Sequence, residues 1–198
     1  MSRLIGIAGG SGSVKSTLAY SLQDRLPNLI EVVHFDDYQK SSEQIHYFNN
    51  MRNWDCPEAI DFDKLLSDLD LLKSGKDVEI MTKSERHNPR YIKDWKRVSY
   101  TMRAKELIII EGYMSLTDER VRELYDLTIF LDLCFEERIK RRTKFISSDY
   151  TEKVLMPMHE MYVEPTKELA DIVIKMEEHN AEEAKEQALA LFQARGFL

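Results

Sequence analysis

The chain has 198 residues, of which 43% are apolar and 32% are charged, and its net charge is −7 at neutral pH. This length favours one domain, and the apolar fraction excludes a disordered chain. The acidic balance argues against general nucleic-acid binding, because phosphate backbones favour a basic protein surface.

The first third of the chain alternates between strand and helix patterns. Residues 3–8 (RLIGIA) form an apolar run that ends at two glycines, as in a buried strand followed by a turn. Helical spacing predicts a helix over 15–26, and residues 29–35 (LIEVVHF) predict a second strand. A long polar stretch over 36–57 precedes an amphipathic helix predicted over 61–73.

The middle of the chain is less regular. Residues 77–103 mix alternating residues with an Asn-Pro pair, and a hairpin and an irregular excursion both remain open there. The runs at 107–110 (LIII) and 127–133 (LTIFLDL) are typical of central parallel strands. A strongly basic helix is predicted over 135–145.

The last part of the chain completes the alternation. We predict a helix interrupted near Pro157 within 151–169, a strand over 171–176 and a terminal helix over 181–194. Strands that alternate with helices predict an α/β fold, with a mainly parallel five-stranded sheet and helices on both faces.

A glycine-rich loop lies between the first predicted strand and helix. It resembles the phosphate-binding pattern G-x-x-x-x-G-K-[ST], so we expect a three-layer fold of the P-loop NTPase type. Backbone N–H groups would form a nest for phosphate at the positive end of the helix. Lys15 would reach the β- and γ-phosphates of ATP, and Ser16 would bind Mg²⁺. The predicted nucleotide-binding residues are Gly9, Gly10, Ser11, Gly12, Ser13, Val14, Lys15, Ser16 and Thr17.

One residue of this loop departs from the pattern. Val14 stands where the pattern has glycine. A β-branched side chain is costly at positive φ, and it adds bulk where the backbone meets phosphate. A natural departure, an engineered change and lost activity all remain open, as does a loop that binds nothing. We expect weaker nucleotide binding than in a Val14→Gly variant.

Carboxylates follow two of the predicted strands. Asp36 and Asp37 lie at the carboxyl end of the second strand, where open α/β sheets place ligand groups, and Glu111 directly follows LIII. A kinase needs a base near the acceptor hydroxyl and a carboxylate near Mg²⁺. A solvated loop or helix cap is the alternative for the Asp pair, and a strand-end turn is the alternative for Glu111.

The remaining composition argues for a reducing compartment. Cys56 and Cys134 lie far apart without metal-ligand spacing, so we expect reduced thiols. The chain shows no leader pattern and no apolar stretch of membrane-spanning length, so we expect a cytoplasmic protein without a membrane partner.

Motifs spread along nearly the whole chain resemble the uridine kinase and phosphoribulokinase family. Bacterial-type uridine kinases are most similar, and nicotinamide riboside kinases are next. The motifs are GGSGSVKST, VVHFDDY, NWDCPEAIDFDKL, LIIIEGY, RIKRRTK and PMHEMYVEPTKELADIVI. The resemblance implies one P-loop kinase domain over 1–198, with a lid at about 136–150 and a variable acceptor-side insertion at about 77–103.

The resemblance also implies a function and residue roles. The chain would phosphorylate the 5′-hydroxyl of a ribonucleoside with Mg·ATP, and Asp36 would accept the hydroxyl proton. Asp55 would bind ribose hydroxyls beside Trp54, and Glu111 would accompany Ser16 at Mg²⁺. Further expected roles are catalysis by Lys15 and Arg141, phosphate binding by Arg138 and Arg142, and acceptor binding by Asp37, Tyr38 and His87.

Two departures from uridine kinases leave alternatives open. The lid is shorter, and residues 78–90 place Met81 where a base-reading Tyr is expected. Nicotinamide riboside or another hydroxyl-bearing metabolite is therefore an alternative acceptor. A nucleotide-binding protein with reduced or lost turnover is the alternative from another class. A nucleotide-hydrolysing switch lacks its N-K-x-D motif, and the oligomeric state stays open, a homo-oligomer included.

Overall fold

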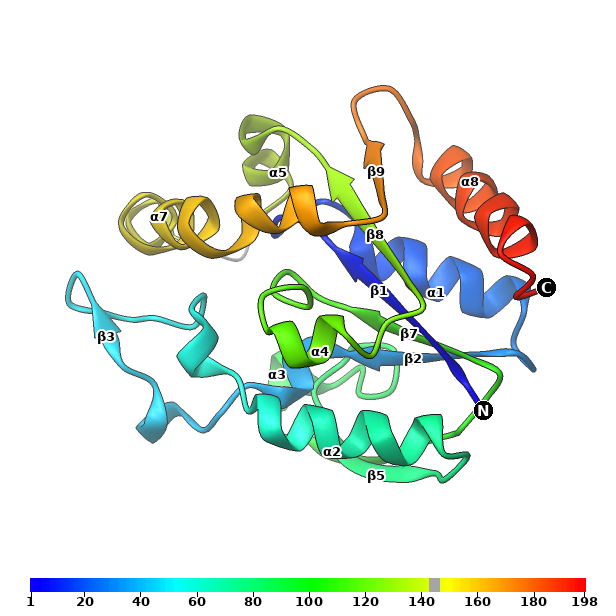
Figure 1. Ribbon diagram of the computed structural model, residues 1–198. Coiled ribbons are helices and arrows are strands. Elements are labelled where there is room, and N and C mark those ends of the chain that lie inside the picture. Colours follow the sequence, from blue (N-terminus) through cyan, green and yellow to red (C-terminus); the bar gives the residue numbers. More distant parts are fainter. Residues whose placement is uncertain (143–146) are drawn as a thin grey trace.

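Five parallel strands form the centre of the fold (Figure 1). The computed structural model describes residues 1–142 and 147–198. The strand order is β2-β7-β1-β8-β9, so β1 lies in the middle with β7 and β8 as neighbours. The strands are β1 (Arg3–Ala8), β2 (Ile30–His34), β7 (Leu107–Glu111), β8 (Leu127–Asp132) and β9 (Ile172–Lys175).

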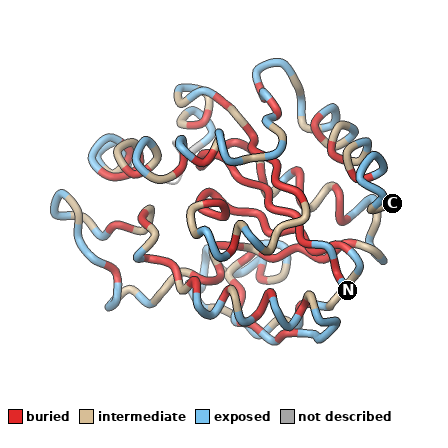
Figure 2. The backbone as a smooth tube through the Cα atoms, viewed as in Figure 1, coloured by how far each residue is buried: buried red, intermediate tan, exposed pale blue. Residues whose placement is uncertain are grey.

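Helices cover both faces of this sheet, as predicted for an α/β fold. On one face, α1 (Lys15–Arg25) and α8 (Ala181–Ala194) pack against alternate strand residues such as Ile5 and Ile109. On the other face, α2 (Phe62–Lys73) and α4 (Glu119–Arg122) pack against Leu4, Ile110 and their neighbours. The strands are therefore buried on both sides, as Figure 2 shows, which explains their continuous apolar sequences.

The strand register brings polar groups together at one edge of the sheet. Parallel pairing sets Ile7 opposite Glu111 and Glu111 opposite His34. The carboxyl ends of β1, β2 and β7 therefore meet where the glycine-rich loop begins. Open α/β sheets bind ligands at this edge.

Residues 77–103 form a hairpin with a long connection. Strands β5 (Val78–Thr82) and β6 (Val98–Met102) pair in antiparallel fashion, and the connection contains the short helix α3 (Tyr91–Asp94). Asn88 closes the base of the connection, since its Nδ2 donates to the carbonyls of Thr82 at 3.3 Å and Lys96 at 2.8 Å. Of the two alternatives left open by the sequence, the structure shows the hairpin.

The polar stretch over 36–57 consists of tight turns and a small hairpin. Three 3-10 turns span Phe35–Tyr38, Ser42–Gln44 and Pro57–Ala59, and β3 (Tyr47–Phe48) pairs with β4 (Met51–Arg52). Ile45, Cys56 and Ala59 pack against Val154 and Met158. This segment therefore lies beside the helical region that follows residue 147.

The helix predicted to break near Pro157 instead continues. The helical run comprises α6 (Ser148–Tyr150), π-helical turns at Thr151–Leu155 and His159–Val163, α7 (Met156–Met158) and a 3-10 turn at Glu164–Leu169. Pro157 has no N–H to donate to Lys153, and the Lys153 carbonyl accepts from Asn49 Nδ2 at 2.8 Å instead. The wide turns thus accommodate the proline without ending the helix.

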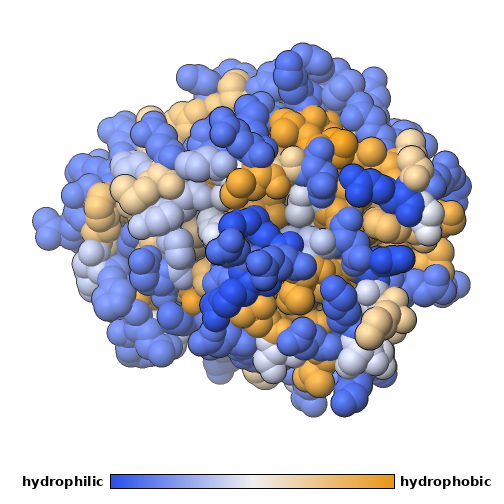
Figure 3. Space-filling view, viewed as in Figure 1, coloured by the Kyte–Doolittle hydropathy of each residue, from blue (hydrophilic) through white to orange (hydrophobic). Residues whose placement is uncertain are grey.

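The basic helix is α5 (Phe135–Arg142), and the rest of its predicted range, like part of the predicted lid, lies outside the described residues. Within the described parts of the chain, no helix is both long and apolar enough to cross a membrane. Figure 3 shows hydrophilic residues over most of the visible face, with smaller hydrophobic areas between them.

Candidate active site

The loop between β1 and α1 is shaped by residues at positive φ. Gly9 has a φ of 140° and Gly12 a φ of 91°, and a Cβ at either position would collide with the backbone of β8 or α5. The N–H of Ser13 donates to the carbonyl of Gly10 at 3.1 Å, which closes the turn. The loop therefore needs glycine for both conformation and close packing.

Val14 occupies the position directly before α1. Its φ is 64° and its ψ is 23°, a left-handed conformation that is rarely adopted by a β-branched residue. Its half-buried side chain packs against the core that α1 shares with the sheet. The backbone thus keeps the conformation for which the motif uses glycine, at a cost on the order of 1–3 kcal/mol in strain.

Two cations lie against this loop. The buried Lys15 Nζ donates to the carbonyl of Gly10 at 3.0 Å. Arg138, from α5, is 3% exposed, and its guanidinium lies so close to Gly10 that a Cβ there would overlap it. Arg138 Nε donates to the carbonyl of Leu133 at 3.0 Å, whereas among the described residues its NH1 atom has no hydrogen-bond partner. A buried donor left unpaired beside a phosphate-type loop fits an anionic ligand.

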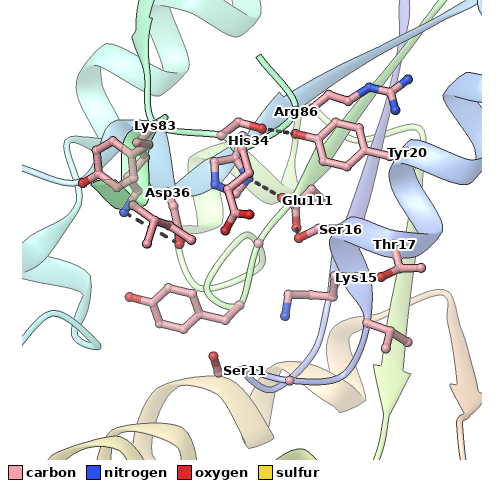
Figure 4. Close-up of a pocket in the computed structure, with 18 of the residues that line it drawn as sticks. Ser11, Lys15, Ser16, Thr17, Tyr20, His34, Asp36, Lys83, Arg86 and Glu111 are labelled. Atoms are coloured by element: carbon pink, nitrogen blue, oxygen red, sulfur yellow. Dashed lines mark hydrogen bonds and ion pairs between the residues drawn. The ribbon is translucent and has the colours of Figure 1, made fainter. Parts of the chain in front are cut away.

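A buried carboxylate connects α1 with two strands (Figure 4). Ser16 Oγ donates to Glu111 Oε2 at 2.9 Å, and His34 Nδ1 lies 2.5 Å from Glu111 Oε1. Although burial disfavours the charged ring, the Glu111 carboxylate raises the pKa of His34 to about 9. The pair is therefore an ion pair at neutral pH. His34 was not among the residues predicted from the sequence, where its only signal was its place at the end of β2.

Ser16 and Glu111 provide the few protein oxygens that a Mg²⁺ ion shared with phosphate needs. The described residues contain no cluster of three or more His, Cys, Asp or Glu side chains that could hold a metal. Mg²⁺ in phosphoryl-transfer sites typically keeps several waters and takes one or two protein oxygens plus phosphate oxygens. A hydroxyl and a carboxylate at hydrogen-bond distance beside the loop fit that requirement.

The glycine-rich loop and the candidate base line one cleft. This cleft has a volume of about 880 Å³, and its walls include Lys15, Ser16, Asp36, Glu111 and Arg141. Asp36 is half-buried, and Lys83 Nζ lies 3.8 Å from its Oδ2 atom. Figure 4 shows Asp36 and Lys83 across the cleft from Lys15 and Ser16. The structure thus brings together the phosphate-side and base-side residues predicted from sequence.

Asp37 and Tyr38, predicted to bind the acceptor, have other contacts. Asp37 is buried and accepts from Thr82 Oγ1 and from the N–H of Lys83, each at 2.6 Å. Burial raises the pKa of Asp37, and the charge of His34 and these hydrogen bonds oppose that shift. Tyr38 is buried in the core and donates to Asp68 Oδ2 at 2.9 Å. In a 3-10 turn successive side chains diverge by about 120°, so neighbours of Asp36 point away from the cleft.

Asp55 and Trp54 do not line the cleft themselves, and each accepts a hydrogen bond from a tyrosine. Tyr150 donates to Asp55 Oδ2 at 2.6 Å, and Tyr113, which lines the cleft, donates to the carbonyl of Trp54 at 2.6 Å. Burial is the main cause that raises the pKa of Tyr113 well above its ordinary value, and the negative charges of Asp55 and Asp36 add to it. Tyr113 therefore lies near both carboxylates. Neither tyrosine was identified from sequence.

His87 does not line the cleft. Its ring stacks on Tyr100 with centroids 3.8 Å apart and meets the edge of Tyr20 at 6.4 Å. Burial lowers the pKa of His87, so the ring is neutral. The prediction of acceptor contact for His87 is therefore corrected, since the aromatic packing beneath the hairpin holds it elsewhere. Lys83, Tyr91 and Trp95 of the same segment line the cleft instead.

The predicted arginines differ in how far they are described. Arg141 is exposed at the cleft wall, and Arg138 is buried against Gly10. The backbone of Arg142 belongs to α5, and the predicted contact of its side chain with phosphate lies outside the described residues.

Comparisons with known proteins give a family match over most of the chain. Residues 4–182 match the model of the phosphoribulokinase / uridine kinase family. A uridine kinase from Streptococcus pyogenes serotype M5 is 32% identical over 184 residues, which cover 86% of this chain and 86% of that protein. A uridine kinase from Streptococcus gordonii is 31% identical over 186 residues, covering 86% of this chain and 85% of that protein.

Solved structures show the same fold at lower identity. A possible uridine kinase from Bacillus stearothermophilus has a TM-score of 0.63 at 20% identity and covers 87% of this chain and 88% of that one. A shikimate kinase from Acinetobacter baumannii in complex with shikimate has a TM-score of 0.55 at 14% identity, covering 98% of this chain and 94% of that one. These two likenesses concern the fold alone.

Proposed function

Because the chain belongs to the phosphoribulokinase / uridine kinase family, we propose that it transfers the γ-phosphoryl group of ATP to the 5′-hydroxyl of a ribonucleoside. Family membership makes the chain a P-loop kinase, a phosphotransferase that acts on a hydroxyl group, with ATP as the implied donor. The observation that carries the proposal is that Lys15, Ser16 and Asp36 line the same cleft, with the two loop residues on one side and Asp36 on the other.

The phosphate side of the cleft supplies positive charge in fixed positions. The loop amides and Lys15 would bind the β- and γ-phosphates, while Arg138 and Arg141 would contact the phosphates from α5. In phosphoryl transfer the negative charge spreads over the equatorial oxygens, so preorganised cations stabilise the transition state. Ser16 and Glu111 would hold Mg²⁺, which supplies further charge neutralisation when bound.

The acceptor side of the cleft supplies the base. The acceptor oxygen would form a bond to the γ-phosphorus as the bond to the ADP oxygen breaks, and Asp36 would take the hydroxyl proton. Asp36 lies at the end of β2, and its neighbour Asp37 fixes the backbone of Lys83 opposite it. A positioned carboxylate typically contributes about 10²–10⁴-fold to such a step.

Asp55 would select the sugar. Its carboxylate already accepts from Tyr150, and a carboxylate has enough lone pairs to accept from vicinal hydroxyls as well. With Asp55 on the ribose hydroxyls, the 5′-hydroxyl would face Asp36, the residue proposed above as the base.

A panel of acceptors tests the proposal. Uridine, cytidine, adenosine, nicotinamide riboside and free sugars are each incubated with Mg·ATP, and phosphorylated products are measured by mass spectrometry. We expect a ribonucleoside monophosphate, and loss of product by about 10²-fold or more in Asp36→Asn. Turnover of free sugars only would refute the nucleoside assignment, and equal turnover in Asp36→Asn would remove Asp36 as the base.

One observation favours a second candidate, a nucleotide-binding protein with little turnover. Val14 holds a left-handed backbone conformation at the phosphate loop. If its side chain prevents productive seating of the β-phosphate, ATP-dependent turnover will be absent in the natural chain and will appear in Val14→Gly. Measurable turnover by the natural chain eliminates this candidate.

A further inference from the structure

The rim of the cleft carries a pair of aromatic residues, one half-buried and one exposed, that the mechanism above does not use. Tyr91 and Trp95, from α3 and its end, both line the cleft. Their rings meet edge to face with centroids 5.6 Å apart, and Trp95 is 73% exposed. The exposed indole of Trp95 is a large apolar surface in contact with water at the rim of a polar cleft, as is typical of a ligand-binding position.

The connection that carries the pair is fixed at several points. Ser84 Oγ lies 2.5 Å from the Tyr20 hydroxyl, which anchors the connection to α1. The N–H of Lys83 is held by Asp37, and Asn88 bridges Thr82 and Lys96. The rim is therefore attached to the same elements that carry the phosphate loop and the candidate base.

The backbone at Trp95 is also unusual. Trp95 has a φ of 50°, a left-handed conformation that ends α3 and that residues with a Cβ adopt at a cost. Its N–H donates to the carbonyl of Tyr91 at 2.7 Å, so the turn that presents the indole is closed. Backbone strain of this kind concentrates at ligand-binding positions.

The other tryptophan has a different environment. Trp54 is half-buried against the cluster formed by Ile45, Cys56 and Met158, and its carbonyl is held by Tyr113. Among the described residues that line the cleft, Trp95 is present and Trp54 is not. Of the two tryptophans in the chain, Trp95 is the one with an accessible ring face at the cleft.

We propose that Trp95, with Tyr91 at its edge, is the stacking platform for a planar heteroaromatic ring on the acceptor. The proposal rests on the proposed function and narrows it to acceptors that carry a purine, pyrimidine or pyridine ring, which excludes free sugars as good substrates. Stacking is tolerant of ring identity because every such ring has a π-face, so the platform favours the class of acceptor and not one base.

The two tryptophans allow a direct binding test that needs no turnover. In a Trp54→Phe protein, Trp95 is the sole tryptophan, and saturating uridine without ATP should quench and shift its emission. In Trp95→Phe, the remaining emission comes from Trp54 beside Asp55, so this protein reports occupation of the sugar site without the proposed stack. Ribose, which has no ring to stack, should leave Trp95 emission unchanged. Calorimetry on the same proteins reports whether each acceptor binds.

Steady-state kinetics give a second measurement. Trp95→Ala should raise KM for the nucleoside by roughly five- to a hundredfold, as expected for loss of one base–aromatic stack. Trp95→Phe should restore most of that loss, and KM for ATP should stay unchanged in both variants. Tyr47→Ala is the matched control, because Tyr47 is 65% exposed on β3 and does not line the cleft.

The outcomes separate the two proposals. Nucleoside binding and turnover with flat Trp95 emission, or with an unchanged nucleoside KM in Trp95→Ala, would overturn the ring platform and leave the proposed function intact. A rise in KM for ATP in place of the nucleoside would assign the indole to the donor and would also overturn it. If no ring-bearing acceptor binds or reacts with the natural chain, the proposed function fails and the platform fails with it.

Discussion

Lys83 Nζ lies 3.8 Å from Oδ2 of Asp36, and the backbone N–H of the same lysine donates to Asp37 at 2.6 Å. The two adjacent aspartates therefore contact different parts of Lys83, its ammonium group and its backbone. Asp37 is buried and fixes where Lys83 leaves the sheet, while Asp36 faces its ammonium in the cleft. Lys83 Nζ also donates to Gln39 Oε1 at 2.6 Å, so its position is constrained from two sides.

We predict that Lys83→Met lowers kcat by about 10- to 100-fold, because Asp36, the proposed base, would lose catalytic alignment if displaced by even about 1 Å. KM for ATP should change little, since the phosphate loop is untouched. Lys83→Arg should recover part of the rate by keeping the charge. Initial-rate measurements at varied ATP and acceptor check this prediction.

Lys76→Met is the control, since Lys76 is an exposed residue of the turn between α2 and β5. It removes the same charge without touching the cleft and should retain the natural kcat. A Lys83→Met protein with unchanged kcat would show that Asp36 needs no help from this lysine.

Val14 gives a prediction about nucleotide affinity. Val14→Gly should bind ATP more tightly than the natural chain, because glycine adopts positive φ without strain and leaves room for the β-phosphate. Val14→Ala separates the two causes, since it removes bulk and keeps a Cβ at positive φ. Calorimetric titration with a non-hydrolysable ATP analogue measures all three proteins. Equal dissociation constants would show that the loop tolerates valine without loss.

The sequence predicted the parts of the site that follow from neighbouring residues. The order of strand, glycine-rich loop and helix fixes where Lys15 and Ser16 emerge, and a carboxylate after a central strand has to lie at the same sheet edge. Glu111 accordingly meets Ser16 at 2.9 Å, although 95 residues separate them along the chain. Hydrophobic runs and helical spacing predicted the layers for the same reason, since burial leaves a local pattern in the sequence.

The missed contacts depend on how distant segments approach each other in space. No local pattern shows that Tyr150 reaches Asp55, which is 95 residues away, or that Lys83 returns to the Asp36 turn. Asp37 and Tyr38 share a motif with Asp36, yet the 3-10 turn sends their side chains to other partners. The continuation of the helix through Pro157 likewise required Asn49 from a distant hairpin to satisfy a carbonyl.

Arg138 should show opposite effects on binding and on stability. Its guanidinium is buried against Gly10, with one nitrogen lacking a hydrogen-bond partner among the described residues. Arg138→Met keeps the apolar stem but removes the charge, so we expect ATP affinity to fall by about 10- to 100-fold. The melting temperature should not fall, because an incompletely paired buried charge costs folding free energy.

Calorimetry and thermal unfolding of Arg138→Met check both halves of this prediction. Arg120→Met is the matched control, since Arg120 pairs with Asp118 and Asp63, does not line the cleft and should leave ATP affinity unchanged. Parallel losses of affinity and melting temperature in Arg138→Met would mean that the arginine serves the fold first.

His159 gives the pH dependence of stability. Its side chain is 11% exposed and lies 3.2 Å from a carboxylate oxygen of Glu164. Burial, together with the charges of Arg138 and Lys15, lowers the pKa of His159 to about 4. The unfolded chain, with a histidine pKa near 6.5, then binds a proton more readily than the folded one. Folded stability should therefore decline as the pH falls from 6.5 toward 4.

We expect this histidine to remove at most about 2 kcal/mol of unfolding free energy between pH 7 and pH 4.5, because the nearby Glu164 carboxylate favours the protonated ring. In His159→Phe, which cannot take up a proton, the decline over that interval should be smaller by this amount. Urea unfolding at a series of pH values measures both slopes, with the exposed His46 changed to Gln as the control. Identical pH dependence in the natural chain and in His159→Phe would place the His159 ring in a more solvated, less cationic environment.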